Sequence, residues 1–227
     1  NIYITSKGTL QQEADADLAL RAQSRLEWRT TGEGGITLNA DTRGTGASVL
    51  AQTADGAGLA GGGVTLAAGQ TIDVAGNWVN RALDGAATPA AVAGGSVQLL
   101  SAHGLNVAAG STIDVSGGVT VSASGAVTGT AAGRIALESN RTVRSTNVPL
   151  SPMIIDGKLM GYSLSQGGSL RVRASEIDIV AAAAPLVTTA ASPASLQLST
   201  GFFTQGGFGR YDVDGAARLT LADGVTL

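Results

Sequence analysis

The residues that could do chemistry are few and lie far apart in the sequence. His103 is the only histidine and cysteine is absent, so the sequence excludes disulfides and thiolate metal sites and leaves a zinc site without enough ligands. A histidine-dependent triad would have to use His103, yet no Gly-x-Ser-x-Gly elbow occurs in the chain. We therefore expect His103 to be an exposed turn residue, and we predict that the chain is not an enzyme.

Acidic side chains offer a second kind of site. Asp73 and Asp114 occupy the same place in two similar segments, and clustered carboxylates of this kind suit polysaccharide cleavage, sometimes with calcium. We expect the two residues to lie roughly 10 Å apart and to be solvated, which is too far for a shared ion. Residues 212–215 (DVDG) resemble the start of a calcium loop but lack its other ligands, so a turn is expected there. We predict no metal and no cofactor.

Two further partner classes are disfavoured by sequence. Residues 56–61 (GAGLAG) match the glycine pattern of a dinucleotide-binding loop, but a strand pattern follows them where that loop needs a helix, so a turn is expected. Lys7 and Lys158 are the only lysines and the net charge is −3. No basic stripe is present to neutralise a phosphate backbone, so we predict no nucleic-acid partner.

Aromatic residues gather near the carboxyl end of the chain. Phe202, Phe203, Phe208 and Tyr211 are four of the eight aromatic residues in the chain. Exposed rings would form an adhesive patch for a partner or a glycan, whereas buried rings would form a local core under a long loop. We favour the local core and keep the four rings as the candidate partner contact.

The elements that must position these residues are predicted to be short strands. Hydrophobic residues make up 44% of the chain, glycines number 33, and only 14% of the residues are charged. A disordered chain would carry more charge, and a helical domain would contain far fewer glycines. A unit of small residues followed by apolar–x–apolar recurs, which is typical of a short strand with one apolar face. It occurs at residues 34–38, 62–66, 94–99, 133–137, 167–172 and 195–198.

A longer repeat connects these strands. Residues 64–76 (VTLAAGQTIDVAG) return as residues 105–117 (LNVAAGSTIDVSG), 41 positions later, and a partial copy closes the chain at 219–227. Strands of this length bury little alone, but stacked in register about 4.8 Å apart they share one apolar column, into which Ile72 and Ile113 are expected to point. With roughly 20 residues per turn of such a solenoid, the offset predicts two turns between the copies.

The sequence therefore predicts an all-β fold, a solenoid with loop excursions, as one continuous unit over residues 1–227. Residues 11–29 carry some helical propensity, but their apolar residues also alternate, and we expect strands there. Proline-containing excursions are expected at 139–167 and 181–195. No apolar run reaches the roughly 18 residues of a membrane span.

The repeated Ala-Ala-Gly-x-Thr-Ile-Asp-Val-(Ala/Ser)-Gly sequence, together with residues 161–170 and 201–209, resembles the large exoproteins of the filamentous haemagglutinin family. This resemblance covers most of the chain. It implies a right-handed parallel β-helix formed as a single-stranded solenoid. It also implies export in an unfolded state through a dedicated outer-membrane secretion pore (TpsB-type, two-partner secretion), followed by folding outside the cell.

What this resemblance implies about function is a structural role. The chain begins and ends in strand-like sequence, so we expect an internal segment of the shaft of a secreted bacterial cell-surface adhesin, which mediates adhesion or presents a distal effector. Its expected partners are the secretion pore and a host or bacterial surface receptor or glycan. Two alternatives stay open, a carbohydrate-active β-helix of the polysaccharide lyase or hydrolase type, and a glycan-binding module.

Overall fold

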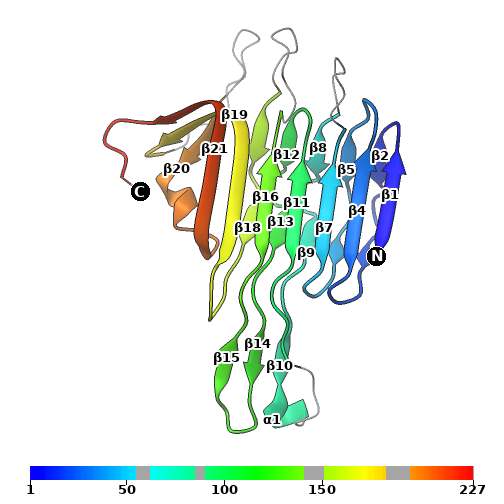
Figure 1. The fold of residues 1–227 in the computed structure, drawn as a ribbon, viewed down its shortest axis with the longest axis vertical. Coiled ribbons are helices and arrows are strands. Elements are labelled where there is room, and N and C mark those ends of the chain that lie inside the picture. The colour runs from blue at the N-terminus through cyan, green and yellow to red at the C-terminus, as the bar shows by residue number, and fades with distance from the viewer. Residues whose placement is uncertain (55–61, 85–89, 141–150, 183–194, 227) are drawn as a thin grey trace.

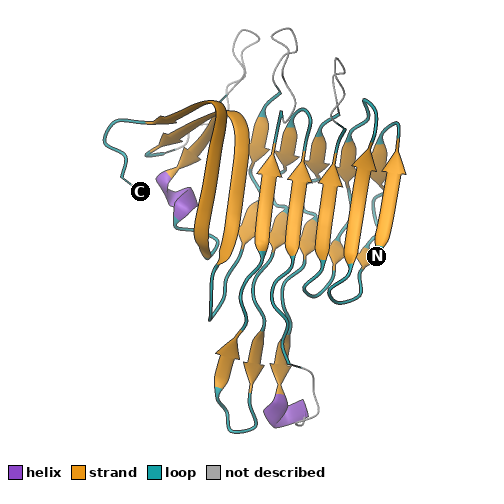
Figure 2. Ribbon diagram, in the orientation of Figure 1, coloured by secondary structure: helices purple, strands orange, loops and turns teal. Residues whose placement is uncertain are grey.

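Short parallel strands account for most of the structure. The computed structural model describes residues 1–54, 62–84, 90–140, 151–182 and 195–226. Within them most strands form three parallel sheets, which we term A, B and C, and a small fourth sheet contains β10 (Trp78–Asn80), β14 (Val119–Val121) and β15 (Val127–Gly129) (Figures 1 and 2). Sheet A contains β1 (Ile2–Ser6), β4 (Arg25–Thr30), β7 (Ser48–Gln52), β11 (Ser96–Leu100), β16 (Arg134–Glu138), β19 (Gly168–Val180), β20 (Leu196–Ser199) and β21 (Phe208–Leu221).

Sheets B and C are made of shorter strands. Sheet B contains β2 (Leu10–Gln12), β5 (Ile36–Leu38), β8 (Val64–Leu66), β12 (Leu105–Val107) and β17 (Met153–Ile155). Sheet C contains β3 (Leu18–Ala19), β6 (Thr42–Arg43), β9 (Thr71–Asp73), β13 (Thr112–Asp114) and β18 (Lys158–Met160). The chain visits the sheets in the order A, B, C and then returns to A, where each new strand pairs in parallel with its predecessor. The all-β class predicted from the sequence is confirmed.

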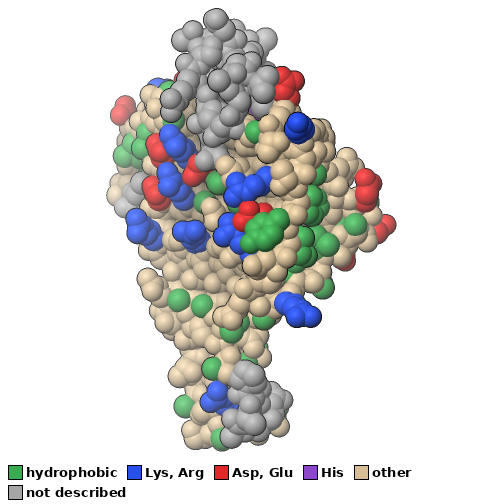
Figure 3. Space-filling model, turned by 45° about the vertical axis from the view of Figure 1, so that its right-hand side comes forward, with side chains coloured by type: hydrophobic (Ala, Val, Ile, Leu, Met, Phe, Trp, Pro, Cys, Tyr) green, Lys and Arg blue, Asp and Glu red, His purple; other side chains and the backbone are tan. Residues whose placement is uncertain are grey.

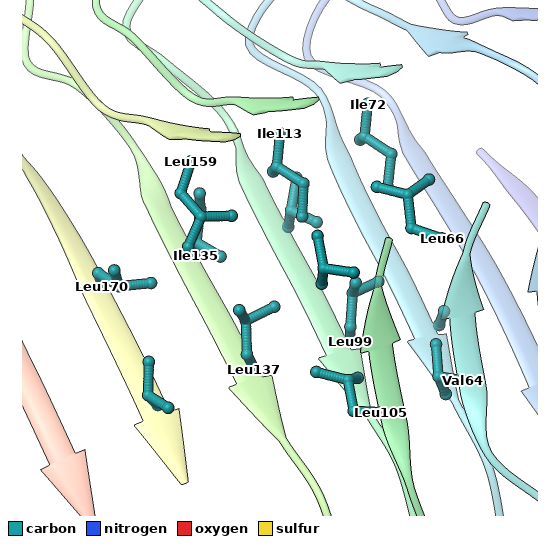
Figure 4. Close-up of a cluster of buried hydrophobic side chains, with 14 of the residues drawn as sticks. Val64, Leu66, Ile72, Leu99, Leu105, Ile113, Ile135, Leu137, Leu159 and Leu170 are labelled. Carbon is teal, nitrogen blue, oxygen red and sulfur yellow. The ribbon is translucent and has the colours of Figure 1, made fainter. Parts of the chain in front are cut away.

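Alternation of apolar and polar residues places one face of each strand in a common core. In β5, Ile36 and Leu38 are buried and Thr37 between them is partly exposed. In sheet C, Ile72 and Ile113 face each other in register and are both fully buried, and Leu159 continues their column (Figure 4). Complete burial of a Leu, Ile or Val side chain contributes about 1.5–3 kcal/mol, so the columns supply the main stabilising term. The inward orientation expected of Ile72 and Ile113 is confirmed.

The amino-terminal segment 11–29 forms strands rather than a helix. It contains the end of β2, all of β3 and most of β4, and the buried side chains of Leu26 and Trp28 belong to the main hydrophobic core. Pairing with β5, β6 and β7 satisfies its backbone groups, and this tertiary pairing outweighs the local helical propensity.

The predicted spacing of the repeat is wrong. β8 and β9 are the direct neighbours of β12 and β13, so the two copies of the repeat are one pass apart and not two. The additional residues leave the stack as a lateral arm, which contains β10 (Trp78–Asn80), helix α1 (Arg81–Asp84), β14 (Val119–Val121) and β15 (Val127–Gly129). In Figure 1 this arm extends below sheet C, and its β14–β15 hairpin is antiparallel. None of the sequence patterns described above indicates this arm.

The predicted excursion at 139–167 is also wrong over part of its length. β17 and β18 fall inside this range and pair with β12 and β13, so they belong to sheets B and C. Residues 141–150 lie outside the described residues, as do residues 183–194 of the excursion predicted at 181–195. Among the helices that the structure describes, none has the length and apolar character needed to cross a membrane.

Candidate functional site

The aromatic cluster lies at the carboxyl-terminal end of the stack, where sheet A has more strands than sheets B and C. We define this cluster as Phe202, Phe203, Phe208 and Tyr211. Sheets B and C stop at β17 and β18, whereas sheet A continues through β20 and β21. The 3-10 helix η1 (Thr200–Phe203) follows β20 and carries the first two rings, and β21 carries the other two. Gly206 and Gly207, with φ of +78° and +73°, allow the reversal between η1 and β21 because a side chain would be strained there.

The four rings of the aromatic cluster contact one another mainly edge to face. The ring centroids of Phe203 and Tyr211 are 5.3 Å apart, those of Phe202 and Phe203 5.5 Å, and those of Phe208 and Tyr211 5.9 Å. All four side chains are partly buried and pack against the hydrophobic core. The Tyr211 hydroxyl donates a hydrogen bond to the carbonyl oxygen of Gln205 at 2.9 Å. Burial of the phenol, with a smaller contribution from Tyr162, raises the pKa of Tyr211.

A cavity of about 530 Å³ opens beside the aromatic cluster. Phe202 and Phe208 form one wall, exposed Tyr162 contributes to the rim, and the terminal strands β17 and β18 supply Ile155 and Leu159. The rings therefore do two things at once, since they cover the end of the core and also line a partly apolar hollow. Both alternatives drawn from the sequence, a local core and a contact patch, remain compatible with this arrangement.

The core role of the aromatic cluster leads to a prediction. Phe208→Ala is expected to lower the free energy of unfolding by about 2 kcal/mol, somewhat less than for a fully buried ring, because Phe208 is only partly enclosed and packs against Gly161. Tyr162→Ala, at a 55% exposed ring on the same cavity, is the matched control and should change stability by less than about 0.5 kcal/mol. Urea denaturation followed by circular dichroism measures both. Equal urea midpoints for Phe208→Ala and the unchanged protein would show that the Phe208 ring does not stabilise the hydrophobic core.

His103 lies in a bend between β11 and β12, as expected of a turn residue, but it is not exposed. It is partly buried, its Nε2 lies 3.2 Å from Oγ of Ser151, and its Nδ1 is buried without a partner among the described residues. Asn140 fixes the serine backbone, because its amide donates to the Ser151 carbonyl oxygen at 2.9 Å and its Oδ1 accepts from the Ser151 N–H at 3.2 Å. Sequence reasoning missed this pair because its members are 48 positions apart.

The geometry of this pair limits its chemistry. A catalytic serine–histidine pair needs an acceptor that holds the Nδ1 proton, so that Nε2 is free to take the serine proton. The described residues supply no such acceptor for Nδ1 of His103, so none of them holds the ring in the tautomer that a serine base requires.

The carboxylates of Asp73 and Asp114 accept hydrogen bonds from nearby backbone N–H groups. Asp73 and Asp114 are in-register neighbours in sheet C, about one strand spacing apart, so the expected 10 Å separation is wrong. Oδ1 of Asp73 accepts the N–H of Ala75 at 3.1 Å, and Oδ1 of Asp114 accepts that of Ser116 at 2.8 Å, so each carboxylate holds the corner that follows its strand. In the parts of the chain that are described, no group of three or more His, Cys, Asp or Glu side chains is placed to hold a metal ion.

The two remaining candidates are the acidic segment and the glycine-rich segment. The expected turn at 212–215 is wrong, because these residues lie inside β21, where Asp214 forms an ion pair with Arg173 at 3.2 Å. The glycine-rich residues 56–61 lie outside the described residues. A functional hypothesis must therefore be based on the sheets, the aromatic cluster and the resemblance in sequence. No protein-family model matches the chain, and neither a curated protein nor a solved structure is significantly similar to it.

Proposed function

We propose that the chain is a segment of the shaft of a secreted bacterial cell-surface protein, built as a right-handed parallel β-helix of the filamentous haemagglutinin type. In this proposal the three sheets wind around one axis as a closed solenoid. The shaft holds an adhesive or toxic end at a distance from the cell that produces it.

One observation carries the proposal, namely that successive passes of the chain stack in register on a single core. In sheet A, Val49, Val97, Ile135 and Leu170 follow one another across adjacent strands, and all are buried. Each pass adds about 4.8 Å along the stack and depends mainly on its two neighbours, so the same design extends without a limit set by one central core. A long and stiff spacer is the function to which such an architecture is best suited.

The sequence resemblance supports the same proposal for export. Passage through a narrow outer-membrane pore requires an unfolded chain, and the absence of cysteine means that no disulfide can form before passage. Stacking then proceeds outside the cell, where each new pass adds to the edge of the previous one. The partners in this proposal are the secretion pore during export and a surface receptor or glycan at the distal end.

A second candidate function is a receptor- or glycan-binding module whose contact is the aromatic cluster. The cavity of about 530 Å³ beside Phe202 and Phe208 favours it, because pockets of this size and mixed polarity accept small ligands. Binding of a glycan array by the chain, lost in Phe202→Ala but kept in Leu83→Ala on the exposed lateral arm, would support this candidate.

Immunogold electron microscopy of intact cells of the source organism tests the shaft. Antibodies raised against this chain are expected to label filaments outside the cell at a constant distance from the outer membrane. Brief protease treatment of intact cells should remove the label, and antibodies pre-absorbed with the chain are the control. Label found only after cell lysis, or confined to the cytoplasm, would contradict the proposal.

A further inference from the structure

Two arginines of sheet A differ from the others in having no acidic partner. Arg25 and Arg29 both contact Glu27, and three further arginines on the strands of sheet A form ion pairs with Asp or Glu. These three are Arg171, Arg173 and Arg218. Arg134 and Arg210 are exposed, and neither side chain forms an ion pair or hydrogen bond with any residue in the described parts of the chain.

The strand register places these two arginines in one row. Arg134 on β16 pairs with Ser169 on β19, and Ser169 pairs with Arg210 on β21. The next residues in the first two strands, Ile135 and Leu170, are buried, so the row Arg134–Ser169–Arg210 lies on the outer face of the sheet. Two strand spacings separate the arginine backbones by about 10 Å. Both long side chains can therefore reach an anion held above Ser169.

A groove follows this row. One hollow of about 290 Å³ is lined by Arg134, Ser169 and Arg210, together with Gln98, Arg171 and the acidic residues Glu138 and Asp212. A second hollow of about 290 Å³ shares Ser169 and Arg210 with the first and continues along the strands over four glycines, an alanine and a glutamine. These additional lining residues are Gly133, Gly167, Gly168, Gly209, Ala132 and Gln166. Because glycines have no side chain, an extended ligand can approach the backbone closely along this floor.

The neighbouring charges restrict where an anion can bind. Arg171, two residues beyond Ser169 in β19, lies 3.6 Å from Glu138 and 3.8 Å from Asp212, and both carboxylates line the first hollow. These carboxylates neutralise Arg171 and repel a second negative charge. Charged side chains of both signs are mixed over the outer face of sheet A, on the left of Figure 3. The unpaired row Arg134–Ser169–Arg210 is therefore the part of this face that attracts an anion.

The chemistry of the groove favours an acidic sugar over an acidic peptide. Guanidinium groups bind carboxylates and phosphates through two parallel hydrogen bonds, and the carboxylate of a uronic acid offers this two-point contact. The groove lies on the face of a sheet whose backbone N–H and C=O groups already pair with adjacent strands, so an extended peptide would leave its own backbone without partners. Sugar hydroxyls can instead bind Ser169, Gln98 and Gln166.

We propose that this groove binds an oligosaccharide that contains uronic acid, with one carboxylate held between Arg134 and Arg210. The hydroxyls of the adjoining sugars lie along the second hollow, over its glycine floor. This binding site does not depend on the proposed shaft function, since it requires only the register of β16, β19 and β21.

Isothermal titration calorimetry of the 227-residue chain with trigalacturonate tests the site. Arg134→Gln and Arg210→Gln are each expected to weaken binding at least about tenfold, and the double variant should abolish it, because each removes a charged two-point contact. Arg43→Gln, which removes the same charge from sheet C, is the matched control and should bind as the unchanged chain does. Arg134→Lys should bind with intermediate affinity, which would show that the planar fork matters. Circular dichroism melting curves verify that each variant is folded.

Three results would overturn the assignment. The first is an absence of trigalacturonate binding by the unchanged chain. The second is equal binding of fully methyl-esterified trigalacturonate, which lacks the charge. The third is equal binding of a triglutamate peptide, which would assign the row to acidic peptides. Loss of affinity as salt is raised from about 50 to about 500 mM is a further expected result, since the contact is between exposed charges.

Discussion

Replacing Ile113 with aspartate is expected to unfold the centre of the protein. Ile113 is fully buried between its sheet C neighbours Ile72 and Leu159. A carboxylate at this position would have no cation or hydrogen-bond donor nearby, and burying it costs at least the roughly 3–5 kcal/mol typical of an unpaired buried charge. Domains of this size are stable by about 5–15 kcal/mol, so the loss is a large share of the total.

Asp114→Asn is the matched control for Ile113→Asp. Asp114 is the next residue, its side chain is on the opposite face, and its Oδ1 accepts the Ser116 N–H, which an asparagine oxygen can also accept. We expect Asp114→Asn to leave the urea midpoint nearly unchanged. Hydrogen exchange should show loss of protection in Ile113→Asp, first in β9, β13 and β18, because stacked strands depend on their neighbours. If Ile113→Asp kept the midpoint and the protection of the unchanged protein, the shared core would be refuted.

Replacing Gly133 with alanine is expected to be nearly as damaging although it adds a single methyl group. Gly133 precedes β16, and a Cβ there would overlap the carbonyl oxygen and carbon of Gly95 in the preceding pass of the chain. Because backbone atoms cannot rotate away as a side chain can, the two passes would have to separate and lose pairing between β11 and β16. The loss should be about 3 kcal/mol or more, at the upper end of overpacking effects.

Gly8→Ala provides the comparison for Gly133→Ala. A Cβ at Gly8 would find its nearest neighbour, Oγ of Ser6, at 4.0 Å, and its backbone does not have a positive φ. Alanine there should leave thermal stability unchanged or raise it slightly, because the unfolded chain loses freedom. Differential scanning calorimetry of the two variants measures the contrast. Similar melting temperatures would indicate that the passes of the chain are not in the close contact described.

The local part of the fold could be predicted from the sequence because it is encoded locally. Apolar–x–apolar triplets such as Val64–Leu66 and Leu105–Val107 show alternation with a period of two, and this alternation became buried and partly exposed positions in β8 and β12. The same alternation correctly favoured strands over a helix near Leu26 and Trp28. Burial of Ile72 and Ile113 followed directly from their place in the repeat.

The register could not be predicted in the same way because it depends on contacts between distant residues. A segment as short as β17 or β18 carries too little pattern to distinguish a stacked strand from a loop, particularly near prolines. The offset between the two copies of the repeat was compatible with either two short passes or one pass plus an arm, and only pairing decides between them. For the same reason the row that Arg134 and Arg210 form could not be predicted from the sequence, because only the pairing of β16, β19 and β21 brings the two arginines together.

The lateral arm has a consequence for how such proteins can vary. At its tip, between β14 and β15, the backbone reverses at Gly125, where φ is +83° and a Cβ added to the glycine would have no other atom within 4 Å. The chain leaves and re-enters the sheets without changing which residues of β13 and β16 meet their neighbours. Evolution or design can therefore lengthen, exchange or replace this hairpin while the core keeps its register. A foreign peptide inserted at Gly125 would be displayed at a fixed height on the molecule and held well away from its main body.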